Sequence, residues 1–151
     1  MIDAVRVRPA TAADAKRIAE LSGTLGYPTE AGALTSRLER LLARDGELVV
    51  VAESATGDVV GWVYAVEREA LEFPARGEIM GLVVDAGARR AGVGRQLVVA
   101  VERWAAGRGL DRVVVRSNVV RPESHPFYEG IGYARVKTQH TYSKPLTPRD
   151  G

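Results

Sequence analysis

Residues 85–94, with the sequence DAGARRAGVG, join a predicted strand over 79–84 to a predicted long helix. A helix that begins here presents unpaired backbone N–H groups and the positive end of its dipole to the loop. Glycines let a bulky anion approach the backbone closely, and Arg89 and Arg90 add positive charge. The stretch therefore predicts an anion-binding loop, suited to phosphate, at a strand-to-helix junction.

Two common phosphate-binding motifs fit this loop poorly. A Walker A loop needs Lys and then Ser or Thr directly after its last glycine, but Val93 and Gly94 follow Gly92. A dinucleotide-binding fingerprint needs a third glycine where this chain has Leu97. Asp111 lies about 20 residues further on, as that fingerprint asks, but it precedes the next predicted strand instead of ending it. Too little chain follows for a doubly wound sheet.

Composition indicates one ordinary domain without a metal. The chain has 151 residues, of which 46% are hydrophobic, and a net charge of +2. This balance requires neither a nucleic acid nor a membrane surface as a partner. The absence of cysteine excludes a disulfide framework, a thiolate metal site and a Cys nucleophile, and the two histidines are far apart. No window has the apolar length of a signal peptide core or a membrane span, so we expect a cytoplasmic protein.

Hydrophobic periodicity predicts alternating strands and helices, with an antiparallel first half and a parallel crossover at the long helix. The predicted elements are a strand over 5–8, helices over 11–25 and 29–44, strands over 48–52, 59–66 and 79–84, a helix from 93 to about 107–109, a strand over 113–115, a helix over 123–131 and an extended segment over 134–142. Thr11 with Asp14 predicts a capping box, and Thr29 predicts the next helix cap. Residues 68–77 are predicted to form a charged loop.

The pattern Arg-x-x-Gly-x-Gly is matched by Arg89, Gly92 and Gly94, and residues 83–94 resemble the coenzyme A signature of the GNAT acetyltransferase superfamily. Further segments resemble the same family in the same order, namely Val7-Arg8-Pro9-Ala10-Thr11 with Asp14, Val60-Gly61-Trp62, Ser117-Asn118, Phe127-Tyr128-Glu129 and Gly132-Tyr133. The resemblance covers nearly the whole chain. It implies an α/β (α+β) fold over residues 1–144, with a mixed central sheet of about six to seven strands and about four helices. Residues 145–151 are expected to fray.

The resemblance implies transfer of an acetyl group from acetyl-CoA to a primary amine, by direct attack in a ternary complex and without a metal. It assigns the cofactor contacts to Leu82, Val83, Val84, Arg89, Arg90, Ala91, Gly92, Val93, Gly94, Arg95 and Asn118. Backbone N–H groups of 90–95 would bind the pyrophosphate, and those of 82–84 would stabilise the thioester oxygen. Gly81 is interpreted either as a bulge that splays the strand or as a site of close packing.

The same resemblance suggests two catalytic side chains. Tyr128 would protonate the departing thiolate, although a tyrosine on a short helix is also a common core residue. Glu78, or a water chain, would take the proton of the amine, although Glu78 could equally be an exposed charge at a strand end. His125 could act as a base, but we favour a packing role. Tyr27 and Trp62 could line the acceptor pocket or simply pack.

The acceptor itself is not identified by the sequence. Glu67, Glu69 and Glu72, with Glu78, could attract a cationic amine, but interrupting arginines favour a solvated loop. The expected acceptor is a small-molecule or peptide amine, and a homodimer could form through the final strands. Two other functions stay open, namely an acyl-CoA-binding sensor or catalytically degenerate homologue, and a nucleotide-binding module that uses the same loop.

Overall fold

The computed structural model describes residues 5–23, 30–88, 92–116 and 124–147, with the backbone alone at 124 and 125. The chain divides into two units, residues 1–116 and residues 117–151. The first unit holds the sheet and three helices, and the second holds a short helix and an extended segment. Nowhere in these described ranges is a helix long and apolar enough to cross a bilayer.

The first unit is built on one mixed sheet in which the strands follow their order in the chain. The strands are β1 (Arg6–Pro9), β2 (Glu47–Glu53), β3 (Val59–Ala70), β4 (Phe73–Val84) and β5 (Val113–Val115). β1 to β4 are antiparallel, and β5 joins β4 in parallel after the long helix, as predicted. The described residues form five strands, fewer than the expected six to seven, because 134–147 pair with no strand.

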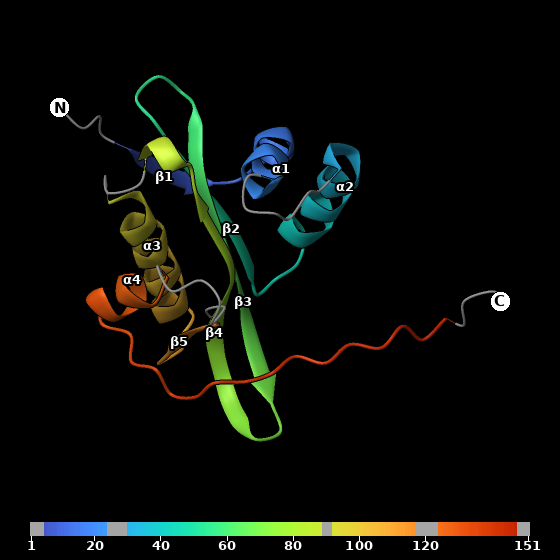
Figure 1. Cartoon of the computed structure of the whole chain (residues 1–151), viewed down its shortest axis with the longest axis vertical. Helices are drawn as coiled ribbons and strands as arrows, with labels where there is room; N and C mark the ends of the chain where they lie inside the picture. The colour runs from blue at the N-terminus through green and yellow to red at the C-terminus, as the bar shows by residue number, and fades with distance from the viewer. Residues whose placement is uncertain (1–4, 24–29, 89–91, 117–123, 148–151) are drawn as a thin grey trace. The chain divides into compact units, whose positions relative to one another are not determined.

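Helices cover both faces of this sheet (Figure 1). α1 (Ala15–Gly23) and α2 (Ala31–Leu42) pack on one face, and α3 (Val93–Gly107) packs on the other. Strand alternation explains why β2 reads as a continuous apolar run, because its successive side chains are buried on opposite faces. α3 covers one face of the sheet and connects β4 to the parallel strand β5, as a crossover between parallel strands requires.

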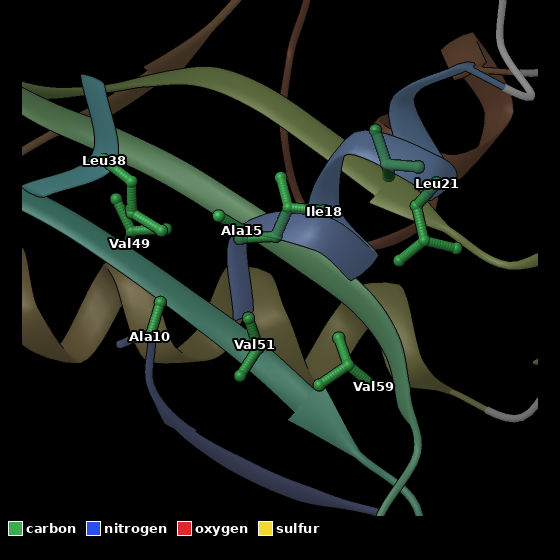
Figure 2. Packing of buried hydrophobic residues seen from close by; sticks show 9 residues of the cluster. Ala10, Ala15, Ile18, Leu21, Leu38, Val49, Val51 and Val59 are labelled. Atoms are coloured by element: carbon green, nitrogen blue, oxygen red, sulfur yellow. The ribbon is translucent and has the colours of Figure 1, made fainter. Parts of the chain in front are cut away.

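The core between the sheet and α1 and α2 is made of small and branched side chains (Figure 2). Ile18 and Leu21 of α1, and Leu38 of α2, meet Val49 and Val51 of β2. Each of these five side chains is at most 6% exposed. Burial of one such side chain stabilises the fold by about 1.5–3 kcal/mol, so this face fixes where β2 and β3 lie.

The first helix begins much as the sequence indicates. A single turn of 3₁₀-helix, Ala12–Asp14, precedes α1, and the carboxylate of Asp14 accepts the Thr11 N–H at 2.8 Å. The cap of α2 is Glu30, whose carboxylate accepts the N–H groups of Gly32 and Ala33. Thr29, the predicted cap, lies outside the described residues.

The prediction of a charged loop over 68–77 is wrong. β3 runs on to Ala70, and β4 already begins at Phe73, so only two residues separate the strands. The segment was misinterpreted because its two arginines are paired with a carboxylate on the strands, a pattern that charge alone does not reveal. Arg68 and Arg76 share the carboxylate of Glu78 from adjacent strands. A run of charges can therefore be a strand wherever each charge has a partner on its own face.

Candidate active site

β4 and β5 part at the middle of β4. Their parallel pairing joins only Gly77 to Val113, Glu78 to Val114 and Ile79 to Val115. β4 then continues to Val84, and in the part of the chain that the structure describes no strand pairs with that outer edge. The register with β3 also shifts here, which leaves Met80 as an extra, half-exposed residue. The sheet therefore opens beside residues 80–84.

Gly81 lies at this opening, against the ring of Trp62. A Cβ atom at position 81 would lie 2.9 Å from two ring atoms, closer than real side chains approach. The bulge inserts Met80 directly before Gly81, so both predicted features of this position, the bulge and the close packing, are present. The indole N–H of Trp62 is buried without a hydrogen-bond partner among the described residues.

The backbone N–H and C=O groups of β4 point toward the opening at every second residue. Asp85 donates its N–H to the Val60 carbonyl at 2.8 Å, which makes these two residues a hydrogen-bonded pair of the antiparallel ladder. Two residues earlier, the backbone N–H and C=O groups of Val83 point toward its pair residue Trp62 on β3 in the same way. The backbones of Leu82 and Val84 therefore face away from β3, toward the other edge of β4, whereas that of Val83 does not.

The start of α3 supplies a second set of donors. Gly92 is the residue before the helix and has a φ of 78°, a conformation that favours glycine. It offers no capping side chain to the first turn, where Val93, Gly94 and Arg95 have N–H groups without helical acceptors. These amides suit an anion such as a pyrophosphate. Arg89, Arg90 and Ala91 lie outside the described residues.

Glu78 lies one pair before the end of the β4–β5 ladder and is 3% exposed, so it is not the exposed charge that was the alternative interpretation. Its Oε1 accepts bonds from Arg76 Nε at 3.1 Å and Nη2 at 2.8 Å, and Arg68 Nη1 lies 3.4 Å from Oε2. Burial alone would raise the pKa of Glu78. The hydrogen bond from Arg76 and the charges of Arg116 and Arg68 outweigh it and lower that pKa. The carboxylate is therefore ionised at neutral pH.

Tyr128 belongs to α4 (Ser124–Gly130) in the second unit. The helix stops where the sequence indicates, at Gly132, which has a φ of 99°. The Tyr128 carbonyl accepts the Tyr133 N–H at 3.0 Å, and the Tyr128 and Tyr133 rings lie 6.1 Å apart, as in a Schellman cap. Burial raises the pKa of Tyr128 to about 12. Its phenol is therefore protonated at neutral pH and able to donate a proton.

Several predicted site residues fall outside what the structure describes. Tyr27, Asn118 and the side chain of His125 are among them. The described residues contain no group of three His, Asp or Glu side chains that could hold a metal ion. Sequence reasoning overlooked Arg116, which follows β5 directly and lies close enough for its charge to act on the Glu78 carboxylate.

Several known proteins with related sequences or the same fold are acetyltransferases. A family model, Acetyltransferase (GNAT) family, matches residues 14–133. Glucosamine 6-phosphate N-acetyltransferase 1 of Oryza sativa subsp. japonica is 33% identical over 149 residues, which cover 91% of this chain and 86% of that protein. Aminoglycoside N(6')-acetyltransferase type 1 of Stenotrophomonas maltophilia is 28% identical over 94% of each chain. The solved structure of aminoglycoside N-acetyltransferase AAC(6')-Iy with CoA shares the fold, with a TM-score of 0.85 at 19% identity over 95% of this chain and 97% of that one.

Proposed function

This chain belongs to the acetyltransferase (GNAT) family and is an acetyl-CoA-dependent N-acetyltransferase, and we propose that it acetylates a small primary amine by direct attack in a ternary complex. One observation carries the proposal, namely that β4, with its open edge, is the strand that precedes the uncapped start of α3 in the chain. A thioester arm along the strand and a pyrophosphate at the helix would use both at once. The named relatives support a sugar amine as the acceptor, because glucosamine 6-phosphate and aminoglycosides both carry one.

We assign cofactor binding to two backbone segments. The N–H groups of Val93, Gly94 and Arg95 would hold the pyrophosphate, together with residues 89–91. Bound acetyl-CoA supplies an activated acetyl thioester. The Leu82 N–H would donate to its carbonyl oxygen, where negative charge grows as the amine attacks. Asn118 would contact the pantetheine arm, as the family resemblance implies.

Glu78 is the proposed proton acceptor. An alkylamine has an ordinary pKa of about 10, so it must lose a proton before or during attack. Glu78 is ionised and lies next to the point where β4 and β5 part. The arginines that lower its pKa also make it a weak base, and it lies about 13 Å along the strand from Leu82, which favours proton transfer through a chain of water molecules over a direct contact.

Tyr128 is the proposed acid that protonates the departing thiolate. Its protonated phenol supports this role, because a group that donates a proton at neutral pH must still hold one. The Tyr128→Phe variant should therefore lower kcat by about 10²-fold or more, with little change in the affinity for acetyl-CoA.

The measurement is release of free coenzyme A in the presence of a panel of amines, beside a titration of acetyl-CoA binding. Tyr142→Phe is the matched control, because Tyr142 is 90% exposed and should have no effect. An unchanged kcat in the Tyr128→Phe variant would show that Tyr128 is not the acid that protonates the thiolate. Tight acetyl-CoA binding without thiol release for any amine would favour a non-catalytic acyl-CoA sensor.

A further inference from the structure

Two arginines face each other across the β3–β4 hairpin. Arg68 pairs directly with Arg76 in the antiparallel register. Like charges at directly opposed positions destabilise a sheet unless an anion lies between them. Glu78 is that anion within the chain, because it lies two residues beyond Arg76 on the same face and accepts bonds from both arginines.

A third arginine comes from the end of β5. Val114 pairs with Glu78, and Arg116 follows β5 directly, close enough for its charge to act on the Glu78 carboxylate. Within the described residues, no carboxylate lies at ion-pair distance from Arg116. Glu67 cannot compensate, because it faces α3 and binds Arg108 Nε at 2.6 Å. We call Arg68, Arg76 and Arg116 the arginine cluster; its three positive charges share the single negative charge of Glu78.

The arginine cluster spans the short β4–β5 ladder, with Arg116 at the end where the sheet opens and Arg68 and Arg76 at the other end. The pair of Glu78 and Val114 is followed by only one more pair before β4 and β5 part. A strand rises about 3.3 Å per residue, so Arg116, level with Met80, lies about 7 Å along the strand from Leu82, whereas Glu78, which holds the guanidinium groups of Arg68 and Arg76, lies about 13 Å from it. The shorter of these distances is within the reach of a small acceptor whose amine is placed at the thioester, so Arg116 would meet the anion of such an acceptor first.

On the basis of the proposed function, we infer that the acceptor is an amine that also carries an anionic group, a phosphate or a carboxylate, which the arginine cluster binds. This inference adds a second recognition element to the amine. It also argues against a polycationic acceptor, because the cluster would repel additional ammonium groups.

The three arginines are not equivalent in this role. Arg76 is largely committed, because it gives two bonds to Glu78 and stacks on the Phe73 ring at 3.6 Å from the centroid. Arg68 is 47% exposed and holds Glu78 through one long contact of 3.4 Å. Arg68 and Arg116 therefore keep donors for a ligand, and a guanidinium binds phosphate or carboxylate through two parallel hydrogen bonds.

The test compares amines that differ only in the anion. The effect of a phosphate is measured by comparing glucosamine 6-phosphate with glucosamine. The effect of a carboxylate is measured by comparing 4-aminobutyrate with butylamine. Kanamycin serves as the polycationic amine. We expect kcat/KM, from coenzyme A release, to be about 10- to 100-fold higher for at least one anionic member than for its neutral partner. Equal values within both pairs, or a preference for kanamycin, would overturn the inference while leaving acetyl transfer intact.

Variants then locate the preference. Arg116→Gln and Arg68→Gln should each reduce it about tenfold, mainly by raising KM for the anionic amine. Arg103→Gln, at an exposed position on α3, is the matched control and should keep the wild-type preference. A preference that persists in the double variant R68Q/R116Q would show that the anion binds elsewhere.

A binding measurement separates this inference from the proposed function. The thermal shift of the CoA-loaded protein with glucosamine 6-phosphate is compared with that for glucosamine. A larger shift with the phosphorylated sugar, lost in R68Q/R116Q, would support the arginine cluster even if no amine were acetylated. Equal shifts would count against it in that case too.

Discussion

Gly81 and Trp62 approach each other more closely than a side chain at position 81 would permit. In the Gly81→Ala variant, the new Cβ would meet the indole ring at 2.9 Å, and the ring is held in the core. We expect a loss of about 1–3 kcal/mol in the free energy of unfolding, measured by urea denaturation. KM for acetyl-CoA should also rise, because Gly81 borders the open edge of β4.

Two further variants check the cause of that loss. Gly107→Ala is the control, because a Cβ there meets nothing within 4 Å, and it should not destabilise the protein. Trp62→Phe removes the outer ring that the new Cβ would meet. The double variant with Gly81→Ala should therefore lose less free energy of unfolding than the two single variants lose in sum. If the two losses of stability simply added in the double variant, contact with the Trp62 ring would not be the cause of the Gly81→Ala loss.

The sequence could identify Gly81 as special but not decide between its two roles. A glycine within an apolar strand indicates either a bulge or a close approach. Both are present here, and the sequence could not show this because register is a property of two strands together. For the same reason Leu82 could not be separated from Val83, whose backbone faces β3.

Among the elements, α4 depends on its glycine stop. Gly132 has a φ of 99°, and a residue with a Cβ there costs about 1–2 kcal/mol. Gly132→Ala should loosen the end of α4 and the packing of Tyr128 against Tyr133. If Tyr128 is the acid, kcat should fall while the urea midpoint of the β-sheet unit, followed by tryptophan fluorescence, stays unchanged. A shift of that midpoint would contradict this local effect.

Elements with a strong apolar period were predictable, and the hairpin was not. The stripe of Val93, Leu97 and Val101 correctly placed α3, since one buried face dominates that helix. The far half of the β3–β4 hairpin has no such stripe, because Glu78 is buried among guanidinium groups instead of hydrocarbon. Patterns of hydrophobicity cannot reveal a strand whose buried side chains are charged.

At the scale of the whole molecule, Asp14 links folding to pH. Arg8 donates two hydrogen bonds of 2.9 Å to Asp14, and these bonds lower the pKa of Asp14 from its ordinary 3.8. A lowered folded-state pKa gives stability that is present above the ordinary value and lost as the pH falls through the folded one. Asp14→Asn should therefore cost about 1–3 kcal/mol at neutral pH and progressively less below about pH 4.

Urea denaturation at neutral pH and near pH 3 measures both values. Asp111→Asn, at an exposed site, is the control, and it should change the free energy of unfolding by less than about 0.5 kcal/mol at either pH. An Asp14→Asn penalty that stayed constant with pH would mean that packing, and not charge, accounts for it. The capping box in the sequence anticipated Asp14 as a helix cap, whereas its partner Arg8 on β1 became evident only in three dimensions.

The open edge of β4 has a cost as well as a use. An unpaired strand edge is a template on which a strand from another molecule can add, and such addition is a common first step in aggregation. The bulge at Met80 twists this edge and makes it a poorer template. Occupation of the edge by coenzyme A would remove the template altogether, so the colloidal stability of the protein should depend on its cofactor.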